Sequence, residues 1–220
     1  MGKLEKAVQF LQDNDYEKAT KLLVKYIEEH PEDPIGYINL GQIFIRTNKY
    51  DDAEKLLQKA IELDDQTPTA YYALGNNFYE QEKYTKAQKQ YEKAIQMGLE
   101  DSDVYYMLGL TLNKQGRLVL AIPYLLRAVE LSPEDIEKHF QYGLTLAKAN
   151  YIEEAEKIFR KIIELDETHT DALFNLGVVH FNRGELQTSL SYFKKTLSID
   201  PDHNLARAGL QNVDNILEES

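Results

Sequence analysis

Apolar and small residues recur along this chain with a period of 34 residues. Each period holds two stretches in which apolar positions lie three, four and seven residues apart, as in Tyr37, Leu40, Gly41 and Phe44. This spacing places the apolar side chains on one side of an α-helix. The pattern therefore predicts an all-α protein whose repeating unit is a pair of amphipathic helices.

Small residues mark where the two helices of each pair meet. One series follows the first helices, at Ala7, Gly41, Gly75, Gly109, Gly143 and Gly177, and a second follows the second helices, at Ala19, Ala53, Ala87, Ala121, Ala155 and Ser189. A single helix pair of this length cannot bury its apolar sides alone, so neighbouring pairs must stack and share a continuous core. The sequence thus predicts an α-solenoid.

Local signals divide the chain into units. Residues that tolerate the left-handed conformation lie between the helices of a pair, with Glu82 as the exception in the series Asn14, Asn48, Glu82, Gly116, Asn150 and Gly184. Prolines end the second helices or open the next first helices, and Pro123 alone falls inside a predicted helix. We predict one domain over residues 1–220, with repeats at 1–33, 34–67, 68–101, 102–135, 136–169 and 170–203.

The remaining residues, 204–220, have the pattern of an amphipathic helix. Its predicted apolar side consists of Leu205, Ala208, Val213, Ile216 and Leu217. A terminal helix that covers the last repeat and turns a polar side to water keeps solenoid proteins soluble. We therefore predict that this helix caps the array.

Charge and composition exclude several classes of partner. The chain has 25 Lys and Arg against 37 Asp and Glu, for a formal net charge of -12, which disfavours nucleic acid and anionic membrane surfaces. It has no cysteine, and hence neither disulfides nor a thiolate metal site. A charged N-terminus without a signal peptide, and the lack of a long apolar run, favour a cytoplasmic protein.

No arrangement typical of catalysis occurs in the sequence. The helix glycines stand alone rather than in a phosphate-binding loop, and there is no nucleophile elbow and no His pair at metal-binding spacing. The five histidines are scattered. We therefore expect no enzyme activity, no cofactor and no metal.

The repeated features together resemble the tetratricopeptide repeat (TPR) family. They are a small residue at the eighth position, Ala at the twentieth, an aromatic residue or Leu at the fourth and eleventh, and Pro near the thirty-second. Segments such as Gly36-Tyr37-Ile38-Asn39 and Tyr105-Tyr106-Met107-Leu108-Gly109 are similar to a small bacterial member. The resemblance implies a right-handed superhelix whose first helices line a concave groove that binds peptide or helical segments of other proteins.

Residues outside the predicted core arc then become the expected peptide-binding groove. The fifth position of the first helices is apolar in every repeat, which is unusual for a solvated helix side. The predicted groove residues are Ile38, Tyr72, Tyr106, Phe140 and Phe174 at this position, with Asn39, Gln42, Asn76, Tyr79, Leu110, Asn113, Leu144 and Phe181 around them. Aromatic anchors dominate binding interfaces. The alternative is that these rings pack between neighbouring repeats.

An acidic rim is predicted beside the groove at Asp103, Glu137 and Asp171. The expected function is a non-catalytic scaffold for protein-protein interaction, whose partner has apolar anchors and basic flanks and binds in a salt-sensitive way. Asn39, Asn76 and Asn113 are expected to contact the partner's backbone. The alternative function is a structural protein that self-associates, with another copy filling the groove or covering the terminal edge of Leu4, Val8 and Leu11.

Overall fold

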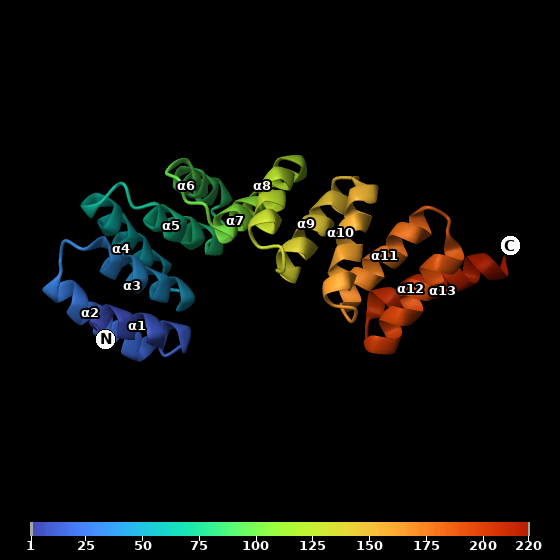
Figure 1. The fold of residues 1–220 in the computed structure, drawn as a ribbon, viewed down its shortest axis with the longest axis horizontal. Coiled ribbons are helices and arrows are strands. Elements are labelled where there is room, and N and C mark those ends of the chain that lie inside the picture. The colour runs from blue at the N-terminus through green and yellow to red at the C-terminus, as the bar shows by residue number, and fades with distance from the viewer. Residues whose placement is uncertain (1, 220) are drawn as a thin grey trace. The chain divides into compact units, whose positions relative to one another are not determined.

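The computed structural model describes residues 2–219, and within them it contains thirteen α-helices and no strand. This confirms the predicted all-α solenoid of helix pairs followed by a C-terminal helix. The chain divides into two compact units, Met1–Arg117 and Leu118–Ser220 (Figure 1). The organisation of residues 1–220 as one domain stays a prediction.

Unit 1 contains three helix pairs and one further first helix. Each helix packs against the next along the chain, and the alternate helices α1 and α3, α3 and α5, and α5 and α7 also contact each other. The first helices thus form a layer of their own (Figure 1). The helices are α1 (Lys3–Gln12), α2 (Tyr16–Glu29), α3 (Pro34–Arg46), α4 (Tyr50–Leu63), α5 (Pro68–Glu80), α6 (Tyr84–Gln96) and α7 (Ser102–Lys114).

Unit 2 begins with a second helix and ends with the C-terminal one. Pro123 lies inside α8 without ending it. The helices of the unit are α8 (Leu118–Leu131), α9 (Ile136–Lys148), α10 (Ile152–Leu165), α11 (Thr170–Asn182), α12 (Leu186–Ile199) and α13 (Asn204–Glu218). The last helix contacts both α11 and α12, the two helices of the pair before it (Figure 1).

At five of the six repeat junctions the last residue of the repeat caps the following helix, and Thr67 is the one that makes no such hydrogen bond. Asp33, Asp101 and Asp135 accept hydrogen bonds from backbone N-H groups in the first turn, as N-cap carboxylates do. His169 and His203 take the same place in unit 2, where each Nδ1 accepts a backbone N-H at 3.1 Å. These helices therefore begin where the 34-residue spacing places a capping side chain.

The turns inside the pairs follow the prediction. Asn14, Asn48, Asn150, Gly116 and Gly184 all have positive φ angles between 57° and 75°. Glu82 occupies the same conformation, with φ of 58°, although a long side chain is disfavoured there. The turn geometry is thus imposed by the helix pair, and Glu82 adopts it at an energetic cost.

The two series of small residues lie in the core, as predicted. The Ala series of the second helices is fully buried, and the buried Ser189 hydroxyl donates to the Gly177 carbonyl at 2.8 Å. A Cβ atom on Gly75 would lie 2.5 Å from the Tyr91 ring, and one on Gly177 would lie 2.5 Å from the Phe193 ring. Glycine is therefore required where a ring from the second helix packs on the first.

The sequence analysis missed two buried positions of the first helices. The third and tenth positions are buried in every first helix from α3 to α11, because these helices also pack against the preceding pair. Three of these tenth positions are polar, and their donor groups bond to backbone carbonyls. Thr111 donates to Met107 at 2.6 Å, Thr145 donates to Gln141 at 2.7 Å, and the Asn77 amide donates to Tyr50 at 3.2 Å.

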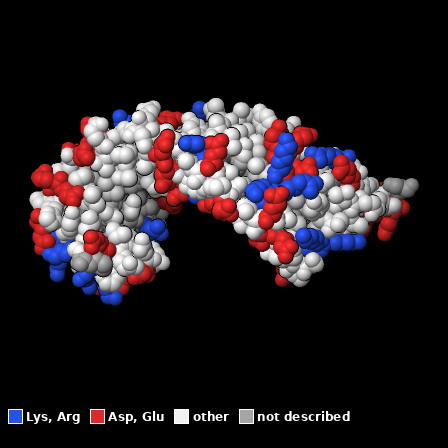
Figure 2. All heavy atoms as spheres, viewed as in Figure 1, with Lys and Arg blue, Asp and Glu red and all other residues white. Residues whose placement is uncertain are grey.

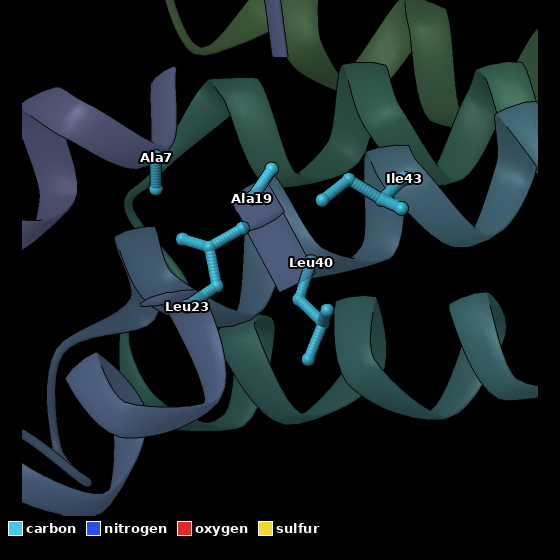
Figure 3. Close-up of a cluster of buried hydrophobic side chains, with 5 residues drawn as sticks. All are labelled: Ala7, Ala19, Leu23, Leu40 and Ile43. Carbon is cyan, nitrogen blue, oxygen red and sulfur yellow. The ribbon is translucent and has the colours of Figure 1, made fainter. Parts of the chain in front are cut away.

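The core at the start of unit 1 combines residues from three helices (Figure 3). Its fully or almost fully buried members are Ala7 of α1, Ala19 and Leu23 of α2, and Leu40 and Ile43 of α3. Leu4 and Leu11 are partly buried and pack against this cluster. The N-terminal edge residues therefore contribute to the core.

The predicted apolar side of the C-terminal helix is partly wrong. Leu205 is 64% exposed, and Ala208 and Ile216 are also exposed. The residues of α13 that pack toward Phe193 are the predicted Val213 and Leu217 together with Ala206 and Leu210. These residues are spaced by four, three and four positions, so they cover a narrower arc of the helix than the predicted set does. Leu205 and Ala208 fall outside this arc and point away from the core.

Candidate functional site

First helices of unit 1 form a surface hollow of ≈ 560 Å³. It brings together three predicted groove residues, Gln42, Tyr72 and Asn76. The remaining lining residues come from α3, α5 and α7, from the start of α2 and from the turn after α3, and they are Tyr16, Ile45, Arg46, Asn48, Glu80 and Met107. Side chains that the sequence spaces a full repeat apart thus converge on one place.

Asn76 is held in a fixed orientation by a buried tyrosine. The Tyr91 hydroxyl donates to Asn76 Oδ1 at 2.7 Å, and Tyr91 itself is fully buried beneath the hollow. Burial raises the pKa of Tyr91 far above its ordinary value, so the hydroxyl stays protonated and continues to donate. Because the amide oxygen of Asn76 is occupied, its NH₂ group is the part left to donate to a ligand.

Tyr72, which lines this hollow, and Tyr79, two turns further along α5, are both half-buried. The Tyr72 ring lies 6.0 Å from the Tyr91 ring, centroid to centroid, and the Tyr79 ring packs edge-on against Tyr84 at 5.6 Å. Burial raises the pKa of Tyr79. One side of the Tyr72 ring is thus supported by Tyr91 of its own repeat, while the residue lines the hollow.

Two charged side chains lie at the hollow without an ion-pair partner in residues 2–219. They are Arg46 near the end of α3 and Glu80 at the end of α5, and both are exposed. The sequence analysis missed them because it considered the twelfth position of the repeat but not the thirteenth, where both stand. The hollow of unit 1 therefore offers a cation, an anion and amide groups beside an aromatic ring.

A second hollow, of ≈ 220 Å³, is lined by residues of α11, α12 and α13 in unit 2. Two predicted groove residues, Phe174 and Phe181, line it, together with Val178, Phe193, Leu205, Ala208, Gly209 and Asn212. Apart from Asn212 its lining is apolar. The residues of α13 that turn away from the core complete this hollow, which explains why that helix keeps an exposed leucine.

The phenylalanine rings of unit 2 rest on the core and on the capping histidines. Phe174 lies 5.8 Å from Phe193 and 5.1 Å from His203, and Phe140 lies 5.1 Å from His169. His203 Nε2 lies 3.3 Å from Asp171 Oδ1. The capping rings thus act as flat supports for the phenylalanines.

The other predicted groove residues lie outside these two hollows. Ile38 is only 5% exposed and cannot serve as an exposed anchor, because α3 packs against the first helices on both sides. The Asn39 amide donates to the Ile35 carbonyl at 2.9 Å, so it is used within its own helix. Those that are half-buried and line neither hollow are Tyr79, Tyr106, Leu110, Asn113, Phe140 and Leu144.

The three residues of the predicted acidic rim are exposed and already have partners. Glu137 accepts from Gln141 Nε2 at 2.9 Å, and Asp171 pairs with His203. Asp103 also takes part in an interaction. These carboxylates lie at the surface, so a basic ligand would have to compete with the neighbouring side chains that already interact with them.

Two searches of the described residues bear on other kinds of site. Residues 2–219 contain no group of three or more His, Cys, Asp or Glu side chains placed to hold a metal ion. In the same part of the chain, no helix has the length and apolarity that crossing a membrane requires.

Sequence models of the tetratricopeptide repeat match residues 10–76, 72–136, 139–169 and 170–203. The solved structure of the TPR protein YrrB is 39% identical over 86% of this chain and 97% of its own, with a TM-score of 0.79. This chain belongs to the TPR family. The YrrB structure is described as a TPR protein with an unusual peptide-binding site.

More distant TPR-like structures share the fold. PilF of Pseudomonas aeruginosa is 19% identical, covering 97% of this chain and 95% of its own, with a TM-score of 0.80. MamA of Desulfovibrio magneticus RS-1 is 23% identical, covering 75% and 93%, with a TM-score of 0.64. No curated protein matches the sequence. TPR domains generally mediate protein-protein interaction and are typically non-catalytic.

Proposed function

We propose that this TPR protein is a non-catalytic interaction module that binds a segment of a partner protein on its first helices. The observation that carries the proposal is the hollow of unit 1, where Tyr72 and Gln42 surround an Asn76 whose amide is oriented by Tyr91. An oriented amide beside an aromatic ring suits a peptide, which presents a backbone carbonyl next to each side chain. The peptide-binding site named for YrrB supports the same reading of the fold.

The partner segment has apolar anchors. In unit 1 an anchor contacts Tyr72 and Ile45, and in unit 2 an apolar side chain fills the hollow of Phe174, Phe181 and Leu205. Burying such a side chain against aromatic rings contributes roughly 2 kcal/mol or more when it is a central contact. The supported rings favour binding because they lose little conformational freedom when the partner arrives.

Charge complementarity favours basic residues beside these anchors. Glu80 lies at the hollow without an ion pair, Asp103 is exposed, and the net charge of the chain is -12. Long-range attraction of this kind raises the association rate more than the affinity, and salt screens it. Arg46 adds a separate preference for an acidic side chain or a terminal carboxylate at one place.

Self-association through the N-terminal edge has less support. Leu4 and Leu11 pack against the core of unit 1, so that edge offers little open apolar surface. The groove therefore remains the proposed site for a different protein.

The test begins with a random peptide library displayed on phage and selected on the purified full chain. The selected peptide is then titrated calorimetrically against wild type and against Tyr72→Ala, Asn76→Ala and Phe174→Ala. Lys59→Ala, on the exposed side of α4, is the matched control. Circular dichroism confirms that each variant is folded.

We expect selected peptides to share apolar residues with basic neighbours. Loss of a central anchor costs about 2 kcal/mol, or roughly a 30-fold weaker Kd, in at least one hollow variant, while Lys59→Ala binds as wild type does. Higher salt should also weaken binding. A library that yields no binder, or a peptide whose affinity no hollow variant changes, would contradict the proposed function.

A further inference from the structure

The second helix α8 exposes apolar side chains where a solenoid protein normally presents polar ones. Val119 is 60% exposed, Leu120 is 48% exposed and Leu126 is 40% exposed, and Pro123 between them is exposed as well. At about 100° per residue these four side chains fall within an arc of about 120°. We call these four residues the α8 patch.

The fold does not require apolar residues at these positions. The core side of α8 is separate and consists of Ala121, Leu125 and Ala128, all fully buried. Moving by multiples of 34 residues gives the equivalents of the patch in the other second helices, and all of them except Val24 are polar or charged. They are Glu17, Lys18, Lys21 and Val24 in α2; Asp51, Asp52, Lys55 and Gln58 in α4; Thr85, Lys86, Lys89 and Glu92 in α6; Glu153, Glu154, Lys157 and Arg160 in α10; and Gln187, Thr188, Ser191 and Lys194 in α12.

Among the second helices of unit 2, α8 is the one that has apolar residues at these positions. On the face drawn in Figure 2, mostly uncharged surface lies over α8, whereas acidic and basic side chains gather over α10 and α12. Contiguous exposed apolar residues on a protein surface mark interaction sites, since leaving them in water is unfavourable. The α8 patch lines neither of the two hollows, so the binding of a peptide to first helices does not explain it.

We propose that the α8 patch binds the α8 patch of a second copy of this chain, forming a weak two-fold dimer. Such a contact must be self-complementary, because the same residues meet from both sides. With the two α8 helices antiparallel and the axis near Pro123, Val119 and Leu120 of one copy face Leu126 of the other. The short Pro123 at the centre lets the helices approach closely.

Charge favours this surface over the equivalent surfaces of the other second helices for joining two copies. The chain carries a net charge of -12, so most contacts between copies bring like charges together. The patch contains no charged residue, whereas the equivalent surface of α10 has two adjacent glutamates. Salt screens the repulsion between the two negatively charged copies, so dimerisation through the α8 patch should become stronger as salt rises. Binding of a basic peptide should instead become weaker as salt rises.

The small size of the α8 patch limits the affinity of the dimer. Stable interfaces involve roughly 20 to 30 residues from each partner, far more than one patch supplies. The dimer is therefore weak, with a Kd on the order of 10 μM to 1 mM. Its consequence is a bivalent molecule with two sets of first helices, which strengthens binding to a partner that presents two copies of the recognised segment.

Sedimentation equilibrium of the full chain across this concentration range tests the dimer. The double variant Leu120→Lys, Leu126→Glu introduces the residues that α6 carries at Lys86 and Glu92, so it is compatible with folding. Val24→Gln is the matched control, because Val24 is the one exposed apolar residue at an equivalent position. We expect concentration-dependent dimerisation of wild type and Val24→Gln, at least about tenfold weaker association of the double variant, and stronger wild-type association at high salt.

Cysteine cross-linking gives an independent readout of the geometry, since the chain contains no cysteine. The two-fold axis places residue 123 opposite itself, so Pro123→Cys should form a disulfide-linked dimer under mild oxidation and Val24→Cys should not. The proposal is overturned if wild type remains monomeric at millimolar concentration. It is equally overturned if the double variant dimerises as wild type does, or if Pro123→Cys cross-links no better than Val24→Cys.

Discussion

Substituting Gly75 by alanine should disturb both the core of unit 1 and the hollow above it. The added Cβ would lie 2.5 Å from Cε1 and 2.6 Å from Cδ1 of Tyr91. The ring cannot move freely, because it is fully buried and its hydroxyl is bonded to Asn76. Ordinary contact therefore requires a shift of the ring or of the helix by several tenths of an ångström.

The expected cost comes from two opposing effects. Overpacking of a core costs about 1–3 kcal/mol, and replacing a helical glycine by alanine returns about 1 kcal/mol of helix propensity. We expect a net loss of up to about 2 kcal/mol. The first repeat shows how the clash can be relieved, because there Ala7 stands at the glycine position and Leu23 stands at the tyrosine position, both fully buried.

The assay is a double-mutant cycle measured by urea unfolding with circular dichroism. Tyr91→Leu alone removes ring contacts and the bond to Asn76 and should cost roughly 2–4 kcal/mol. In the double variant Gly75→Ala, Tyr91→Leu, the new methyl group fills part of the space that the ring leaves. The double variant should therefore be more stable than the sum of the single losses by about 1–3 kcal/mol. Strictly additive losses would refute the proposed packing.

Two further predictions concern single residues. Glu82→Gly relieves the positive φ of 58° and should raise the free energy of unfolding by about 1 kcal/mol in urea titrations, whereas no gain would mean that the turn is unstrained. Burial raises the pKa of Glu156, but hydrogen bonds from Arg160 and Arg183 outweigh it and leave the pKa below the ordinary value. Its contribution to stability is therefore complete above the unfolded glutamate pKa of about 4.3 and is lost as pH falls through the lower folded pKa. Glu156→Gln should flatten the acid limb of a stability-pH profile, and an unchanged limb would contradict the assignment.

The fold was predictable because its determinants are local and repeated. The glycines and alanines at the helix crossings, and the Asn and Gly residues in the turns, each occupy one place in the 34-residue period. The third and tenth positions were harder to predict. Thr111 and Thr145 are buried although they are polar, because each hydroxyl bonds to a carbonyl of its own helix, and that bond leaves no signal in hydropathy.

The site was predictable only in part because it depends on neighbouring helices. Periodicity identified Tyr72 and Phe174, which line the hollows. It assigned the same role to Ile38, which is buried because α3 has neighbouring helices on both sides. The orientation of Asn76 comes from Tyr91, fifteen residues away on another helix. Such a contact becomes evident only when the helices are placed in space.

Amide chemical-shift mapping with the library-selected peptide shows whether a partner segment lies on the first helices. We expect the largest shifts on α3 and α5 around Gln42, Tyr72 and Asn76, or on α11 and α13 around Phe174. Shifts confined to the second helices α4, α6 and α10, with those residues unaffected, would contradict this expectation.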